Sequence, residues 1–134
     1  STLMRSSAAS DVYKRQVFVH ANPQVRVDSA KVAVVKGPLV YCVEEADNGE
    51  NLSSVMVNTD QKIEETYDDE LLEGCSVLHI TGKKISEKGW NEGTLYQNRK
   101  AELEDVKLTL VPYCYWGNRE NGEMLVWMKE LFYM

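Results

Sequence analysis

The feature that most constrains this fold is a series of short apolar runs separated by turn signals, with no helix-periodic segment of ten residues or more. Residues 31–35 form a nearly continuous apolar run, whereas Val106, Leu108 and Leu110 alternate with polar residues. Alternation with period two is typical of a half-buried strand, and a continuous run is typical of a strand covered on both faces. The pattern predicts an all-β chain built as an antiparallel β-sandwich.

Other strands are expected where β-branched and aromatic residues lie between Gly, Pro and Asn. These segments are 17–19, 25–27, 39–45, 55–57 and 75–80, and the strand around 106–116 is expected to pair with 124–129 across a loop at 117–122. Asp47-Asn48-Gly49 predicts a hairpin turn, because Asn and Gly tolerate positive φ. The acidic stretch from Glu64 to Glu70 is interpreted as a solvated face.

The first sixteen residues differ from the rest of the chain. Their small polar residues show no apolar period, and the run DVYKRQ at 11–16 resembles the translated end of a transposon adapter used for sequencing libraries. We therefore expect residues 1–16 to be a non-native, disordered segment and exclude them from the fold. The alternative is a natural disordered arm, and neither interpretation gives the segment a chemical role.

Composition and charge exclude several classes of protein. The 134 residues are 43% hydrophobic and 27% charged, which fits a folded globular chain. No apolar run approaches the roughly 20 residues of a membrane span, and a net charge of -6 makes a nucleic-acid partner unexpected. No signal peptide is apparent, but if residues 1–16 are non-native this says nothing about localisation. Unpaired cysteines are typical of cytoplasmic proteins, and they are the sole basis for interpreting the localisation as cytoplasmic.

The cysteines are sparse and odd in number. Cys42, Cys75 and Cys114 form no C-x-x-C pair, so we expect reduced and mostly buried thiols rather than a disulfide framework. Neither His20 nor His79 lies at ligand spacing from a cysteine, which disfavours a structural zinc site.

Two segments resemble one enzyme family. The first is ANPQVR at 21–26 leading into KVAVVKGPLVYCVE at 31–44, and the second is VPYCYWGNR at 111–119 followed by GEMLVW at 122–127. Their order and spacing are similar to the region downstream of the catalytic domain in glycoside hydrolase family 127, the β-L-arabinofuranosidase-like proteins of bacteria. The resemblance covers nearly all of 17–134. It departs from the usual pattern at Lys36, where arginine is common, and at Ser29-Ala30, where glycine is common.

The resemblance implies that the catalytic residues and the β-sandwiches belong to different domains. Family members combine an (α/α)6 catalytic barrel with β-sandwich domains, and their mechanism resembles a retaining one with a cysteine nucleophile near zinc and a glutamate acid/base. Those residues and the zinc belong to the barrel. This chain has no Cys-Cys pair, so no catalytic residue, cofactor or metal ligand is assigned to it. The resemblance places 17–45 at the end of the middle sandwich and 46–134 in the C-terminal sandwich.

Several residues are of types that act in catalytic sites, but their positions in the sequence do not support a catalytic role. Cys42 lies in an apolar strand without a nearby histidine, so a buried core thiol is favoured over a nucleophile. Glu73-Gly74-Cys75 offers too few ligands for a metal site. Glu44 and Glu45 are adjacent and point to opposite faces of a strand, so they cannot form a glycosidase carboxylate pair. Pairing either with Glu123 is speculation.

The aromatic residues near the C-terminus have two interpretations. A sugar-stacking platform would use Tyr113, Tyr115, Trp116 and Trp127, because aromatic faces suit the apolar face of a sugar ring. The favoured interpretation is that they fill the core and an interdomain interface, because a regular strand divides Tyr113 and Tyr115 from Trp116. Asn118-Arg119 indicates a structural turn in which Arg119 binds carbonyls or a carboxylate, with direct substrate contact as the alternative.

Three functions follow from these features. The favoured one is a non-catalytic accessory segment of a glycosidase that covers and braces an absent catalytic barrel of the same polypeptide. The second is an autonomous carbohydrate-binding module that uses the aromatic residues. The third is an interaction or dimerisation domain with unpaired strand edges. Truncation of the longer polypeptide also predicts an exposed apolar patch where the barrel or the missing sandwich strands would pack.

Overall fold

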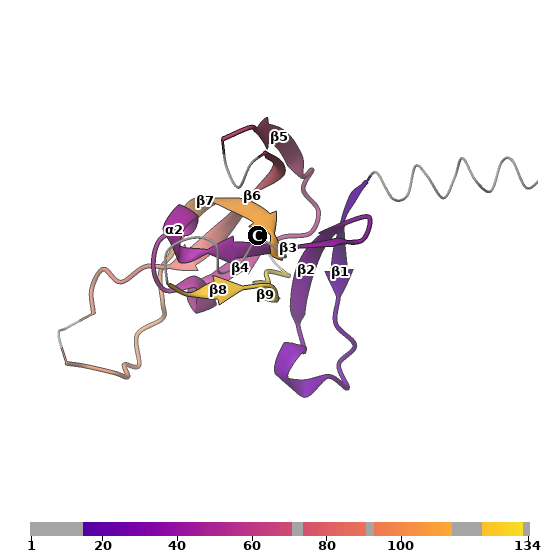
Figure 1. The fold of residues 1–134 in the computed structure, drawn as a ribbon. Coiled ribbons are helices and arrows are strands. Elements are labelled where there is room, and N and C mark those ends of the chain that lie inside the picture. Colours follow the sequence, from indigo (N-terminus) through magenta and orange to yellow (C-terminus); the bar gives the residue numbers. More distant parts are fainter. Residues whose placement is uncertain (1–14, 71–73, 91–92, 114–121, 133–134) are drawn as a thin grey trace, which may run out of the picture.

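The computed structural model describes residues 15–70, 74–90, 93–113 and 122–132. Its described part is almost entirely strands, joined by three short helical turns (Figure 1). The elements are β1 (Gln16–His20), η1 (Arg26–Asp28), β2 (Lys31–Lys36), β3 (Leu39–Glu44), α2 (Glu45–Asn48), η2 (Leu52–Ser54), β4 (Val55–Val57), β5 (Glu64–Asp68), β6 (Cys75–Ile85), β7 (Leu103–Pro112), β8 (Met124–Leu125) and β9 (Met128–Glu130).

Six of these strands close a ring. They pair in the order β2-β9-β4-β6-β7-β3, and β3 pairs back with β2. The β4–β9 pair is parallel and the other pairs are antiparallel. β1 extends the sheet from β2, β5 from β6, and β8 from β3. The predicted all-β class is confirmed. The expected sandwich is corrected to a closed barrel, because β9 joins β2 to β4 where two stacked sheets would leave open edges.

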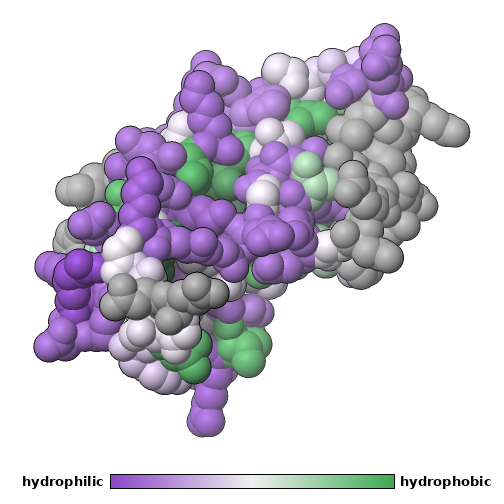
Figure 2. Space-filling view, turned by 90° about the vertical axis from the view of Figure 1, so that its left-hand side faces the viewer, coloured by the Kyte–Doolittle hydropathy of each residue, from purple (hydrophilic) through white to green (hydrophobic). Residues whose placement is uncertain are grey.

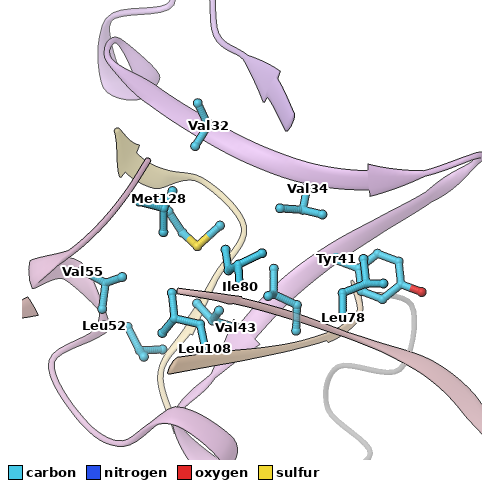
Figure 3. Packing of buried hydrophobic residues seen from close by; sticks show 12 residues of the cluster. Val32, Val34, Tyr41, Val43, Leu52, Val55, Leu78, Ile80, Leu108 and Met128 are labelled. Atoms are coloured by element: carbon cyan, nitrogen blue, oxygen red, sulfur yellow. The ribbon is translucent and has the colours of Figure 1, made fainter. Parts of the chain in front are cut away.

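The interior of the ring is filled by aliphatic side chains from all six strands (Figure 3). Leu78 and Leu110 are cross-strand partners, as are Ile80 and Leu108, and all four are buried. Cross-strand partners point to the same face of a sheet, so their burial identifies the inward face of β6 and β7. The remaining core members are Val32, Val34, Tyr41, Val43, Leu52, Val55, Val57 and Met128.

Strands on both sides of residue 45 contribute to this core. Tyr41 and Val43 on β3 pack in the same cluster as Leu108 and Leu110 on β7, and β3 pairs with β7. The predicted boundary between 17–45 and 46–134 therefore falls at the start of α2, within the ring. The predicted non-native segment 1–14 lies outside the described residues, and Gln16 is already the first residue of β1.

Three local predictions are wrong. The expected strand 25–27 is absent: Val25 precedes the 3-10 turn η1 at Arg26–Asp28, and its N–H donates to the Asn22 carbonyl oxygen at 2.8 Å. The expected Asn48-Gly49 hairpin is the end of α2, where Gly49 alone adopts a positive φ of 82°. The expected strand 124–129 is two strands, and neither pairs with β7: β8 pairs with β3, and β9 pairs with β2 and β4.

Two side-chain amides complete the sheet where strand pairing stops. Asn48 faces β7 at the end of β3: its Nδ2 donates to the Thr109 carbonyl oxygen at 2.9 Å, and its Oδ1 accepts from the Thr109 N–H at 2.7 Å. Gln61 fills the corresponding gap beside β6, between the ends of β4 and β5. Its amide hydrogen-bonds to the Thr81 N–H and C=O, each at 2.7 Å. Each amide satisfies backbone groups that a neighbouring strand would otherwise bind.

Candidate functional site

Most residues of the predicted aromatic and turn site lie outside the described part of the chain, namely Tyr115, Trp116, Asn118 and Arg119. Of the others, Tyr113 follows the last residue of β7 and is 46% exposed. Trp127 is half-buried between β8 and β9. Neither residue belongs to a core cluster. The described residues therefore assemble no sugar-stacking platform from the predicted set.

The predicted carboxylates have structural contacts. The Glu45 backbone N–H donates to the Glu123 carbonyl oxygen at 2.9 Å, and the Glu45 carboxylate accepts from the Glu123 N–H at 2.7 Å. The Glu123 carboxylate accepts from the Asn51 N–H at 3.3 Å. Glu45 and Glu123 are thus close together, but each carboxylate binds backbone N–H groups. Their arrangement fastens the chain before β8 to the start of α2.

The two described cysteines lie on the outside of the ring. Cys42 and Cys75 are buried together with Val77 and Val111, and Met124 and Val126 pack against them. These apolar neighbours agree with a packing role for Cys42. Within the described residues, no group of three or more His, Cys, Asp or Glu side chains is placed to hold a metal ion. Glu73 and Cys114 lie outside the described part.

The outer face of β1, β2 and β3 carries exposed valines. Val17 pairs with Val35, which pairs in turn with Val40, so the three side chains form one row on one face. Val19 lies on the same face. Val17, Val19 and Val40 are 43%, 37% and 39% exposed. We call Val17, Val19, Val35 and Val40 the outer valine face.

This face continues the covered apolar surface around Cys42. Cys42 lies two residues after Val40 on β3, and residues two apart on a strand share a face. The Cys42 end of the surface is buried, and the Val40 end is exposed to solvent. The outside of the barrel is therefore apolar over β3, but the described residues cover only one end of it.

The opposite side of the barrel has a different surface. The described parts of the connection between β6 and β7, residues 86–90 and 93–102, project away from the β1–β2 hairpin (Figure 1). Seen from that side, the molecule is mostly hydrophilic, and its hydrophobic areas are small and separate (Figure 2). An extended row of valines is therefore a property of the β1–β3 side.

A cavity of about 710 Å³ opens beside Gln61. Its apolar lining comes from Val106 and Leu131, with Gly82 between β4 and β7. Its polar lining comes from Asn58, Asp60, Gln61, Thr81, Lys83, Asp105 and Lys107. We call this the Gln61 cavity. Two smaller hollows of about 420 and 470 Å³ also border Gln61, so this side chain lies at the centre of a concave region.

The Gln61 cavity has a fixed wall. The Gln61 amide makes four hydrogen bonds, to the carbonyl oxygens of Asn58 and Thr81 and from the N–H and hydroxyl of Thr81. Lys83 forms an ion pair with Asp105. Gly82 is required here, because a Cβ at this position would lie 2.7 Å from the Met56 carbonyl oxygen. No local pattern predicts this cavity, since its residues come from four separate segments of the chain.

An ion pair ties the β1–β2 hairpin to β5. Lys36 Nζ lies 2.5 Å from a Glu65 carboxylate oxygen, which also accepts a hydrogen bond from Gln16 Nε2 at 2.6 Å. The hydrogen bond from Lys36 holds the pKa of Glu65 below its usual value, and partial burial opposes this effect. These contacts fix the hairpin that carries the outer valine face.

The described residues contain no helix with the length and apolar character needed to cross a bilayer. The described residues form a small all-β barrel domain with a partly exposed apolar face and a polar cavity beside Gln61.

This chain belongs to glycoside hydrolase family 127. The profile of the glycoside hydrolase family 127 C-terminal domain matches residues 17–129. The family resemblance inferred from the sequence motifs is thereby confirmed, and so is its assignment to the C-terminal region.

Three relatives place the domain within longer proteins. The non-reducing end beta-L-arabinofuranosidase of Bifidobacterium longum subsp. longum is 34% identical over 119 residues, which is 84% of this chain and 18% of the relative. The crystal structure of a GH127 beta-L-arabinofuranosidase from Geobacillus stearothermophilus T6 is 38% identical, with a TM-score of 0.82 over 87% of this chain and 18% of that one. A further GH127 beta-arabinofuranosidase structure is 34% identical, with a TM-score of 0.73 over 87% of this chain and 17% of that one. The chain spans less than a fifth of each relative.

Proposed function

We propose that this chain is a non-catalytic accessory domain of a β-L-arabinofuranosidase-like glycosidase. Its outer valine face packs on the rest of that polypeptide, which includes an (α/α)6 catalytic barrel, and the contact stabilises the barrel. The observation that carries the proposal is the row of Val17, Val35 and Val40, in which Val17 and Val40 are exposed and Val35 is half-buried although the row continues a buried apolar surface. The family and the small share of each relative that the chain spans support the same assignment.

The energy available at this face is sufficient for intramolecular docking. Burying the exposed remainder of Val17, Val19 and Val40 contributes about 4 kcal/mol at about 25 cal/mol per Å². A domain joined covalently to its partner does not lose the full translational entropy of association, so a face of this size is enough. The ion pair between Lys36 and Glu65 keeps the hairpin in place without the partner.

A domain exchange tests the proposal. Residues 17–129 replace the equivalent domain of the Bifidobacterium longum relative, and Val19→Asp/Val40→Asp is introduced into both the chimera and the isolated chain. We expect the double variant to lower the thermal inactivation midpoint of the chimera by about 3–6 °C and to leave the isolated chain within about 1–2 °C.

The matched control is Val27→Asp. Val27 is 77% exposed in η1, away from the outer valine face, so we expect no change in either protein. Equal midpoints for the wild-type and double-variant chimeras would contradict docking through this face. Hydrolysis of a nitrophenyl arabinofuranoside by the isolated chain would contradict the non-catalytic assignment.

A further inference from the structure

We propose that the Gln61 cavity binds a neutral sugar. This inference goes beyond the accessory role, because the cavity uses none of the residues of the outer valine face. It also differs from the aromatic site predicted from the sequence, because the described residues that line the cavity include no aromatic side chain.

The Gln61 cavity is preformed. Its volume of about 710 Å³ falls in the range of about 300–1,000 Å³ that is typical of small-molecule sites. The Gln61 amide is held by four hydrogen bonds, and the Leu131 N–H donates to the Val57 carbonyl oxygen at 2.7 Å. A ligand that enters a fixed site spends little free energy on ordering it.

The charged side chains that line the cavity balance one another. Asp60 and Asp105 line the cavity together with Lys83 and Lys107. An anion would meet the two carboxylates, and a cation would meet the two ammonium groups. The cavity therefore favours a ligand without net charge.

Two charged side chains of the cavity can form hydrogen bonds with a ligand. Lys83 is paired with Asp105, whereas Asp60 and Lys107 have no ion-pair partner among the described residues. A hydroxyl group donates to a carboxylate and accepts from an ammonium group, so a polyol satisfies both. Asn58 adds an amide whose Oδ1 already accepts the Asp60 N–H at 2.7 Å, which leaves its NH2 group available to a ligand hydroxyl.

The apolar lining completes the match. Val106 and Leu131 offer aliphatic surface between the polar groups. A sugar ring has a C–H face and a hydroxyl edge, so it fits a site with an aliphatic floor and a polar rim. Because the described lining offers no aromatic ring to stack on, we expect weak binding, with a Kd of about 1–20 mM.

The test is an NMR titration of the full 15N-labelled chain with L-arabinose and with methyl β-L-arabinofuranoside. We expect saturable shifts of the Gln61 side-chain amide and of the Thr81, Gly82 and Val106 backbone amides. Asp60→Asn and Lys107→Met should each weaken binding about fivefold or more, since each removes a charged hydrogen-bonding group. Both residues are exposed, so both variants should retain the wild-type spectrum elsewhere.

The matched controls are Asp69→Asn and Lys100→Met, which make the same chemical changes at exposed positions outside the cavity. Both should bind like wild type. The sugar assignment is overturned by unsaturable shifts, by shifts located elsewhere, or by wild-type binding in Asp60→Asn and Lys107→Met. It is also overturned if glycine betaine, a zwitterion, shifts the same amides and the sugars do not.

The outcome is separable from that of the docking proposal. Val19→Asp/Val40→Asp should leave sugar binding unchanged, and Asp60→Asn should leave the inactivation midpoint of the chimera unchanged. Loss of sugar binding with intact docking, or the reverse, therefore identifies which proposal has failed.

Discussion

Replacing Asn48 by alanine removes the amide that joins α2 to β7. The wild-type side chain makes three hydrogen bonds: Nδ2 donates to the carbonyl oxygens of Glu44 and Thr109, each at 2.9 Å, and Oδ1 accepts from the Thr109 N–H at 2.7 Å. Alanine leaves both Thr109 backbone groups unpaired at a half-buried position. A typical hydrogen bond contributes about 1 kcal/mol, and a stranded buried group costs about 1–3 kcal/mol. We expect the free energy of unfolding to fall by about 3 kcal/mol.

Urea denaturation followed by far-UV circular dichroism measures this change. The midpoint should move to lower urea while the slope stays constant, and the thermal midpoint should fall by about 10–15 °C. Asn98→Ala is the matched control, because Asn98 is exposed, and it should stay within about 0.5 kcal/mol of wild type. A value for Asn48→Ala equally close to wild type would refute the role assigned to the amide.

Asn48→Asp separates donor from acceptor at the same position. The variant keeps an acceptor for the Thr109 N–H but turns a carboxylate toward the carbonyl oxygens of Glu44 and Thr109. This repulsion raises the pKa of the new carboxyl above its unfolded value. Its protonated form, which donates one hydrogen bond, is therefore favoured by folding. The loss of stability relative to wild type should shrink as the pH falls, and a constant loss would contradict the geometry.

Three further changes test other parts of the barrel. Gly82→Ala should destabilise the chain by about 1–3 kcal/mol in urea, because its Cβ would lie 2.7 Å from the Met56 carbonyl oxygen; an unchanged midpoint would contradict the close approach. Leu110→Ala should cost about 2–5 kcal/mol as a fully buried core truncation, and a cost below 1 kcal/mol would place it outside the core. The folded pKa of Glu65 lies below its unfolded value, so its contribution is complete above the unfolded pKa and is lost as the pH falls through the folded pKa. On acidification the wild-type chain should lose at most about 1 kcal/mol of its free energy of unfolding through Glu65, and Glu65→Gln should remove this loss. The same pH dependence of stability in both proteins would contradict the role of Glu65.

The strands with clear hydrophobic patterns were predictable from the sequence. The run 31–35 became β2, and the alternation of Val106, Leu108 and Leu110 became the centre of β7. The end of β6 was missed because Gly82 and two lysines interrupt its pattern. Gly82 is present because the β4 backbone approaches closely, which is a property of the tertiary structure.

The closure of the sheet was not predictable by the same means. Alternation identifies which face of a strand is buried, but it does not identify the neighbouring strand. β9 bridges β2 and β4 over distances of about 70 residues or more in sequence, and nothing local to residues 128–130 indicates this. Asn48-Gly49 misled for a related reason, because the Asn48 side chain binds Thr109 from a distant strand.

The candidate sites divide in the same way. The continuous apolar run 31–35 indicated a strand covered on both faces, and Val35 at the end of this run belongs to the outer valine face, which the described residues leave partly uncovered. Asp60, Gln61 and Lys107 form no motif, because β6 and β7 bring them together only in the folded barrel. Sequence reasoning therefore predicted β2 and β3 as strands and missed the cavity.

The most direct test of the accessory role is hydrogen exchange at the outer valine face. Amides of β1 and of the first residues of β3 are compared between the isolated chain and the chimera with the Bifidobacterium longum relative. Docking predicts slower exchange of residues 16–20 and 39–40 in the chimera, while the amides of the β6–β7 core exchange alike in both proteins. Identical exchange at residues 16–20 and 39–40 in the two proteins would contradict the account.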